Sequence, residues 1–134
     1  MRYQRAESPA RLNGLAAAQT FFANCFADSD PGRERLWVAH LDDEARCMQL
    51  SFHDGGAMEV DVPVRDIIRD AALLGSAGVV LAHNHPSGDH RPSDGDCRAT
   101  RKLALAAEAI DLTIVDHLVF GGDGCSSFRR MGLL

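Results

Sequence analysis

The residues best suited to chemistry lie between Ala82 and Asp96, where histidine, serine and aspartate are closely spaced. His83 and His85 are two positions apart at the end of Gly78 to Ala82, a short apolar run typical of a fully buried strand. Side chains along a strand alternate between two faces, so both imidazoles project from the same face. Each ring can therefore present a nitrogen to one ion.

A carboxylate follows the two histidines at the start of the next expected helix. Ser93 and Asp96 are three positions apart and match a capping-box signature, which places Asp96 in the first turn. Pro86 disfavours helical geometry at His85 and keeps the histidine pair extended. Two imidazoles and one carboxylate are the three-ligand set of a hydrolytic zinc site, whose remaining position holds water. The pattern therefore predicts a zinc ion bound by His83, His85 and Asp96.

Helices and strands alternate along the chain around these residues, with turn signals between them. The expected helices run from Ser8-Pro9 to near Asp28–Gly32, from Val64 to Leu74 with a stop at Gly75, and from Ser93 to about Ala109. The expected strands are Leu36–Leu41, Cys47–Phe52, Met58–Val62, Gly78–Ala82, Leu112–Phe120 and Ser126–Met131, with turns at Asp42–Glu44, Asp54–Gly56 and Gly121–Gly124. This alternation predicts an α/β sandwich around a mixed sheet.

Length and composition indicate one ordinary globular domain covering residues 1–134. The chain is 46% apolar and 25% charged, and no apolar run is long enough to span a bilayer. The N-terminus lacks the apolar segment of a secretory signal, so we expect a cytoplasmic protein. The net charge of −5 argues against an autonomous nucleic-acid binder. The four cysteines never form a C-x-x-C pair, which argues against a thiolate zinc site or a redox pair.

The pattern His83-x-His85-Pro86 followed by Ser93-x-x-Asp96 resembles the metal-binding signature of the JAMM (MPN+) metallopeptidase family. The bacterial RadC-like branch is the nearer match, through His-Asn-His-Pro-Ser-Gly-Asp at 83 to 89, Pro92-Ser93 and Asp116-His117-Leu118-Val119-x-Gly121. This resemblance covers about residues 8 to 131. It implies a cytidine-deaminase-like, three-layer α-β-α sandwich (a JAB/MPN domain) with one zinc. It further implies that a metal-activated water cleaves a peptide or isopeptide bond in a peptide or protein substrate.

The resemblance also implies two catalytic residues beside the metal ligands. Ser93 is expected to stabilise the tetrahedral oxyanion, and its hydroxyl can cap a helix at the same time because it has one donor and two acceptor lone pairs. A glutamate is expected to take the proton of the water. In RadC-like chains this glutamate precedes the first core strand, which ends in Leu-Asp, and counting back from Leu41-Asp42 gives Glu34. Glu59, on an expected half-exposed strand, is the alternative.

Other polar residues near the motif have structural explanations. His117, flanked by Asp116 in an apolar strand, is expected to be a structural histidine with a hydrogen-bonded ring. Ser87 and Asp89 are expected to form the polar loop that follows His85. His90 is expected to be exposed in this loop, with a substrate contact as the alternative.

Each of three rival functions would leave a different mark in the sequence. A zinc deaminase needs H-x-E followed by P-C-x-x-C, and an HNH nuclease spreads its three residues over a ββα unit; the sequence has neither pattern. A non-catalytic RadC-like interaction module, linked to DNA repair or mobile elements, should lack a ligand or the base, whereas every one is retained here. The helix-hairpin-helix segment that precedes this domain in RadC proteins is not found in these residues, so a DNA-repair role has no DNA-binding element to support it.

Overall fold

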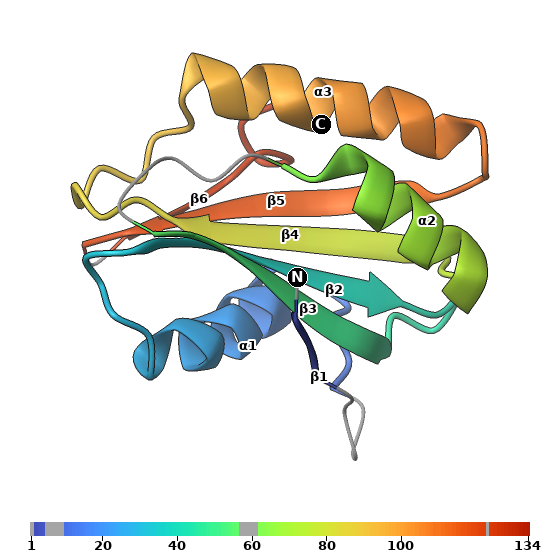
Figure 1. Cartoon of the computed structure of the whole chain (residues 1–134), viewed down its shortest axis with the longest axis horizontal. Helices are drawn as coiled ribbons and strands as arrows, with labels where there is room; N and C mark the ends of the chain where they lie inside the picture. Colours follow the sequence, from blue (N-terminus) through green and yellow to red (C-terminus); the bar gives the residue numbers. More distant parts are fainter. Residues whose placement is uncertain (1, 5–9, 57–61, 123) are drawn as a thin grey trace.

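The computed structural model describes residues 2–4, 10–56, 62–122 and 124–134, which form an α/β fold (Figure 1). The strands are β1 (Arg2–Gln4), β2 (Glu34–Leu41), β3 (Cys47–Gly56), β4 (Gly78–Asn84), β5 (Thr113–Gly121) and β6 (Gly124–Ser127). The helices are α1 (Leu15–Ala27), α2 (Val64–Leu74) and α3 (Asp94–Glu108).

Within the described residues the strands form one mixed sheet in the order β1-β3-β2-β4-β5-β6. Only the β4–β5 pair is parallel among the pairings described, and α3 makes the crossover connection that a parallel pair requires. Figure 1 shows α1 on one side of the sheet and α2 with α3 on the other. The three-layer α-β-α sandwich that the resemblance implied is thereby confirmed.

The alternation of side chains along β2 divides the core between the two faces of the sheet. Trp37 and Ala39 pack into the cluster that includes Phe22 of α1. Leu36 and Val38 pack into the opposite cluster, which also contains residues of α2, α3 and β4. Burying one large aliphatic side chain contributes about 1.5–3 kcal/mol, so a sheet covered on both faces needs no metal ion to form.

The first helix begins later than the sequence indicated. Ser8 and Pro9 lie outside the described residues, and α1 starts at Leu15. Leu12 is not helical, because its N–H donates to the carbonyl of Ala45. Backbone pairing with the turn after β2 therefore outweighs the local helix signal.

Two strand boundaries also differ from expectation. Asp54 to Gly56 continues β3 and does not turn, because Asp54 pairs with Arg35 and Gly56 with Glu34. Residues 57–61 of the expected Met58–Val62 strand lie outside the described residues. At the other end of the chain, β6 stops at Ser127 and Met131 lies in a turn, whereas the hairpin at Gly121–Gly124 is confirmed. No helix in the described part of the chain combines the length and the apolar character needed to cross a membrane.

Candidate metal centre

Strand pairing brings three distant parts of the chain together at one end of the central strands. His83 lies near the end of β4 and pairs with Leu36 of β2 and Val119 of β5. Because β2 runs antiparallel to β4, its first residue, Glu34, lies beside the end of β4. The loop after β4 carries His85 and leads to α3, whose first turn contains Asp96.

Three donor atoms converge at this end of the strands. Nε2 of His83 lies 2.9 Å from Nε2 of His85, and Oδ2 of Asp96 lies 3.3 Å and 3.1 Å from these two nitrogens. A zinc ion with tetrahedral bonds of about 2.0–2.2 Å separates its donors by roughly 3.3 Å. The three atoms therefore already have nearly the spacing of one face of a zinc tetrahedron, and the residues fit this metal.

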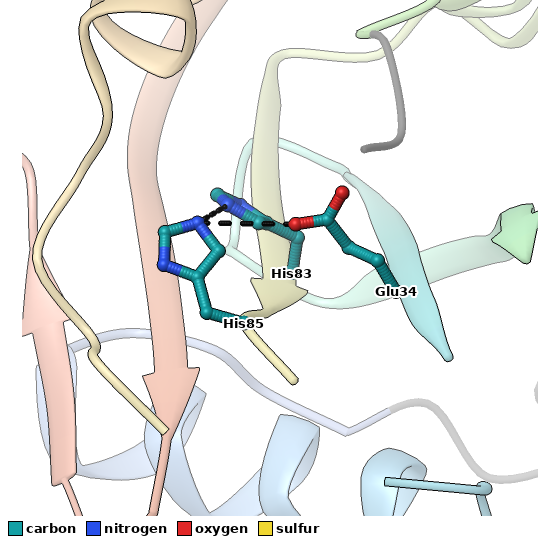
Figure 2. A group of neighbouring side chains, drawn as sticks. All are labelled: Glu34, His83 and His85. Atoms are coloured by element: carbon teal, nitrogen blue, oxygen red, sulfur yellow. Dashed lines mark hydrogen bonds and ion pairs between the residues drawn. The ribbon is translucent and has the colours of Figure 1, made fainter. Parts of the chain in front are cut away.

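Glu34 supplies a second carboxylate to the same cluster (Figure 2). Its side chain is buried, and Oε1 lies 3.9 Å from Nε2 of His85. Ligand atoms of Glu34, His83 and His85 all lie within 4.8 Å of one another. Either carboxylate can thus complete a metal-binding set with the two histidines, and Asp96 is the nearer.

Hydrogen bonds set the protonation of the cluster. The bond to Asp96 raises the pKa of His85, although burial opposes the shift. Burial favours the neutral form of Asp96, but hydrogen bonds from His83 and His85 outweigh it and hold the pKa of this carboxyl well below its usual range. Asp96 is therefore ionised at neutral pH, and a metal that binds here must displace protons shared with the histidines.

The second nitrogen of each histidine also has a partner. Nδ1 of His85 lies 2.7 Å from the carbonyl oxygen of Asp89, and Nδ1 of His83 lies 2.7 Å from Nε2 of His117. Such contacts are typical of metal-binding histidines, because they fix the ring and the nitrogen that carries the proton. Both Nε2 atoms consequently face Asp96.

The predicted capping box is confirmed and fixes Asp96 in place. Oγ of Ser93 accepts the N–H of Asp96 at 3.0 Å, and Oδ2 of Asp96 accepts the N–H of Ser93 at 2.8 Å. The oxyanion role of Ser93 stays a prediction. The alternative base, Glu59, lies outside the described residues.

The loop between β4 and α3 has the local bonds expected of it, with one correction. Oγ of Ser87 accepts the N–H of Asp89 at 3.3 Å, and Oδ1 of Asp89 accepts the N–H of Arg91 at 3.0 Å. His90 is half-buried instead of exposed, because its Nδ1 lies 2.7 Å from Oγ of Ser126 on the neighbouring hairpin.

Two contacts at the centre were missed by the sequence interpretation. Asn84 bonds to the backbone on both sides of Glu34: Oδ1 accepts the N–H of Arg35 at 2.7 Å, and Nδ2 donates to the carbonyl of Arg33 at 2.9 Å. The expected hydrogen-bonded ring of His117 is confirmed, and one of its partners is His83, a contact that the sequence did not indicate. The sequence offered only two local signals of these contacts: Asn84 is a polar residue between two histidines, and His117 is a histidine in an apolar strand.

Comparison with known proteins shows that the family model for the RadC-like JAB domain matches residues 12–133. The chain belongs to the RadC-like JAB domain family. This RadC-like domain is 37% identical over 129 residues to a UPF0758 protein of Paraburkholderia xenovorans, covering 96% of the chain and 46% of the relative.

Two further relatives carry the same family name. The UPF0758 protein YfjY of Escherichia coli is 36% identical over 106 residues, with 76% of the RadC-like chain and 64% of the relative covered. A UPF0758 protein of Pelodictyon phaeoclathratiforme is 34% identical over 106 residues, with 78% and 48% covered. The chain thus spans about half the length of two of these relatives. Their names state no reaction, so any activity has to be argued from the site.

Proposed function

We propose that this RadC-like domain is a zinc-dependent hydrolase that cleaves a peptide or isopeptide bond. The observation that carries the proposal is the convergence of Nε2 of His83, Nε2 of His85 and Oδ2 of Asp96 within 3.3 Å, with Glu34 buried beside them. When bound, zinc lowers the pKa of a water molecule to about 7 and polarises a substrate carbonyl. The remaining requirements are a proton acceptor and a group that stabilises the oxyanion.

The different distances of the two carboxylates suggest different roles. Asp96 lies close to both histidine nitrogens and is best suited to be the third ligand. Glu34 lies 3.9 Å from His85, beyond direct hydrogen-bond distance, and its carboxylate is suited to accept a proton from a water molecule beside the ligands. Glu34 can take a proton from the attacking water and then deliver it to the leaving amine nitrogen. Its burial excludes bulk water from this transfer.

Ser93 is the best candidate for the oxyanion donor. Its hydroxyl oxygen accepts the N–H of Asp96, and a hydroxyl that accepts a hydrogen bond can also donate its proton to a substrate. As the N-cap of α3 it also lies at the positive end of the helix dipole, which favours a developing negative charge. Capping and oxyanion stabilisation are therefore compatible.

A cleft of about 460 Å³ next to His85 offers space for substrate. Phe26 and Phe120 contribute aromatic walls, and Pro86 lies at the side of the histidine. An apolar cleft with backbone groups from the glycine residues of the neighbouring hairpin suits a peptide with an apolar side chain near the scissile bond.

The test combines metal analysis with a search for cleavage. The zinc-loaded protein is incubated with a library of peptides, and new termini are identified by mass spectrometry. We expect cleavage that requires zinc and is lost in both Glu34→Gln and His85→Ala. A zinc-loaded protein that cleaves no peptide or isopeptide substrate would contradict the catalytic proposal and favour an interaction module.

A further inference from the structure

His117 lies at the centre of a buried chain of hydrogen bonds behind the metal centre. Its side chain is fully buried on β5, and both ring nitrogens have partners. Nε2 lies 2.7 Å from Nδ1 of His83, and Nδ1 lies 2.7 Å from Oγ1 of Thr100. The ring also stacks on Phe128 with a centroid distance of 4.6 Å and an interplanar angle of 15°.

Metal binding at His83 allows only one arrangement of protons along this chain. When Nε2 of His83 binds a metal, the proton of its neutral ring must be on Nδ1, which donates to Nε2 of His117. The proton of the neutral His117 ring must then be on Nδ1, where the hydroxyl oxygen of Thr100 accepts it. The ring N–H of each of the two histidines then has an acceptor.

Helix α3 contacts the metal centre at two points, once directly and once through this chain of hydrogen bonds. Asp96 and Thr100 are one turn apart on α3, and both are buried against the sheet. Asp96 contacts His83 directly, whereas Thr100 contacts it through His117. The strand that carries His83 is therefore linked to the same helix on both sides of the imidazole ring.

We propose that His117 is a positioning residue that holds the proton of His83 on Nδ1 and thereby keeps Nε2 available to the metal. The inference rests on the proposed zinc site. In many metal sites a carboxylate or a carbonyl accepts this hydrogen bond. A neutral imidazole orients the ring equally well but adds no negative charge to a centre that already contains two carboxylates.

Two substitutions at position 117 separate the two hydrogen bonds. The side-chain amide of glutamine reaches the position of Nε2, whereas the shorter amide of asparagine reaches only the position of Nδ1. His117→Gln therefore keeps an acceptor for His83, and His117→Asn keeps only the contact to Thr100. Zinc dissociation constants, measured by competition with a chromophoric chelator, should be similar for wild type and His117→Gln. His117→Asn should bind zinc about 10- to 100-fold more weakly.

Thr100→Val extends the test to the far end of the chain. Valine has nearly the same shape but cannot accept the proton of His117, so zinc binding should weaken here too. Phe128→Leu is the control, because it removes the ring stack and leaves the hydrogen bonds intact. It should lower the melting temperature of the metal-free protein without changing the affinity for zinc.

The outcomes distinguish this inference from the proposed function. A wild-type protein that binds no zinc would overturn both. A wild-type protein that binds zinc, with unchanged affinity in His117→Asn and Thr100→Val, would overturn the positioning role alone. Equal weakening in His117→Gln and His117→Asn would overturn it as well, since packing would then explain both losses. If neither variant at 117 folds, the affinity of Thr100→Val decides.

Discussion

Asn84 holds Glu34 in place through the backbone, with one hydrogen bond to the residue before it and one to the residue after it. The amide oxygen accepts the N–H of Arg35 at 2.7 Å, and the amide nitrogen donates to the carbonyl of Arg33 at 2.9 Å. Because Asn84 also lies between His83 and His85 in the sequence, the same short segment that carries two proposed ligands fixes the proposed base.

Removing this link should reduce the rate without removing the metal. In Asn84→Ala, Glu34 loses its fixed distance to His85, and a misplacement of about 1 Å can reduce a rate by about 10²-fold. Asn84→Asp is the matched variant, because it can still accept from Arg35 but cannot donate to Arg33. We expect zinc content to stay at the wild-type level in both variants. The loss of turnover should be larger in Asn84→Ala than in Asn84→Asp. Loss of zinc from Asn84→Ala would contradict a role confined to Glu34.

The third ligand can be identified by comparing two isosteric changes. Asp96→Asn keeps an acceptor for the N–H of Ser93 but removes the negative charge next to both histidines, so we expect zinc to be lost. Glu34→Gln should retain zinc. Metal analysis of both proteins decides which carboxylate binds the ion, and the reverse result would make Glu34 the ligand.

His85→Ala should abolish zinc binding while the sheet remains folded, because the core is packed on both faces without the ion. A ligand that binds only the native state at 100 times its dissociation constant stabilises it by about 2.7 kcal/mol. A chelator should therefore lower the melting temperature of wild type and leave that of His85→Ala unchanged. Full zinc retention by His85→Ala would refute the ligand assignment.

The base itself is tested by the rate of the zinc-loaded Glu34→Gln protein. The amide is nearly isosteric but cannot accept a proton from water, and general bases contribute about 10²- to 10⁴-fold to a rate. We expect a loss of this size with unchanged zinc content. An active Glu34→Gln enzyme together with an inactive Glu59→Gln enzyme would make Glu59 the base.

The sequence was sufficient for the part of the site that depends on local geometry. Strand alternation placed His83 and His85 on one side, and the capping box placed Asp96 in the first turn of α3. The two backbone partners of Asn84 lie 49 and 51 residues away, and His117 lies 34 residues from His83, so only strand pairing reveals these contacts. Glu34 is an intermediate case, because its position came from counting along a family pattern and not from any local signal.

Contacts between residues far apart in the sequence also explain where the predicted fold was wrong. Leu12 is an apolar residue in the expected amphipathic helix, but its N–H donates to the carbonyl of Ala45, 33 positions further along the chain. Asp54 begins a glycine-rich turn signal, yet pairing with Arg35 keeps it in β3. In both cases backbone hydrogen bonds to a distant strand or turn outweigh a short-range preference.

His40 should make the domain less stable in mild acid. Burial lowers the pKa of this fully buried ring, although Asp70 opposes the shift, and Nδ1 lies 3.0 Å from Oγ of Ser76. The pKa is about 6.5 in the unfolded chain. Folding therefore favours the neutral ring, so its stabilisation is complete above that pH and is lost as the pH falls toward the lower folded pKa.

The check is the free energy of unfolding of the metal-free protein, measured with urea from about pH 7.5 to about pH 5.5. His40→Asn keeps a polar group opposite Ser76 but does not titrate in this range. We expect wild type to lose more stability than the variant over the interval. The comparison removes the contribution of His85, whose raised pKa acts with the opposite sign. Parallel pH profiles for the two proteins would contradict the prediction.

Ser93 is the residue at which structural and catalytic roles give different outcomes. If the hydroxyl only caps α3, Ser93→Ala should cost about 0.5–2 kcal/mol of stability and leave the turnover of folded enzyme nearly intact. If it also donates to an oxyanion, the same change should reduce the rate by about 10²- to 10³-fold with zinc still bound.

Ser93→Asp separates the two roles. Aspartate accepts the N–H of Asp96 as serine does and should restore much of the stability, because it is an equally good N-cap. It has no proton to donate when ionised, and its charge lies where negative charge develops in the transition state, so activity should remain lost. Melting temperature, zinc content and turnover measured on wild type, Ser93→Ala and Ser93→Asp distinguish these effects. An active Ser93→Asp enzyme would leave Ser93 with helix capping alone.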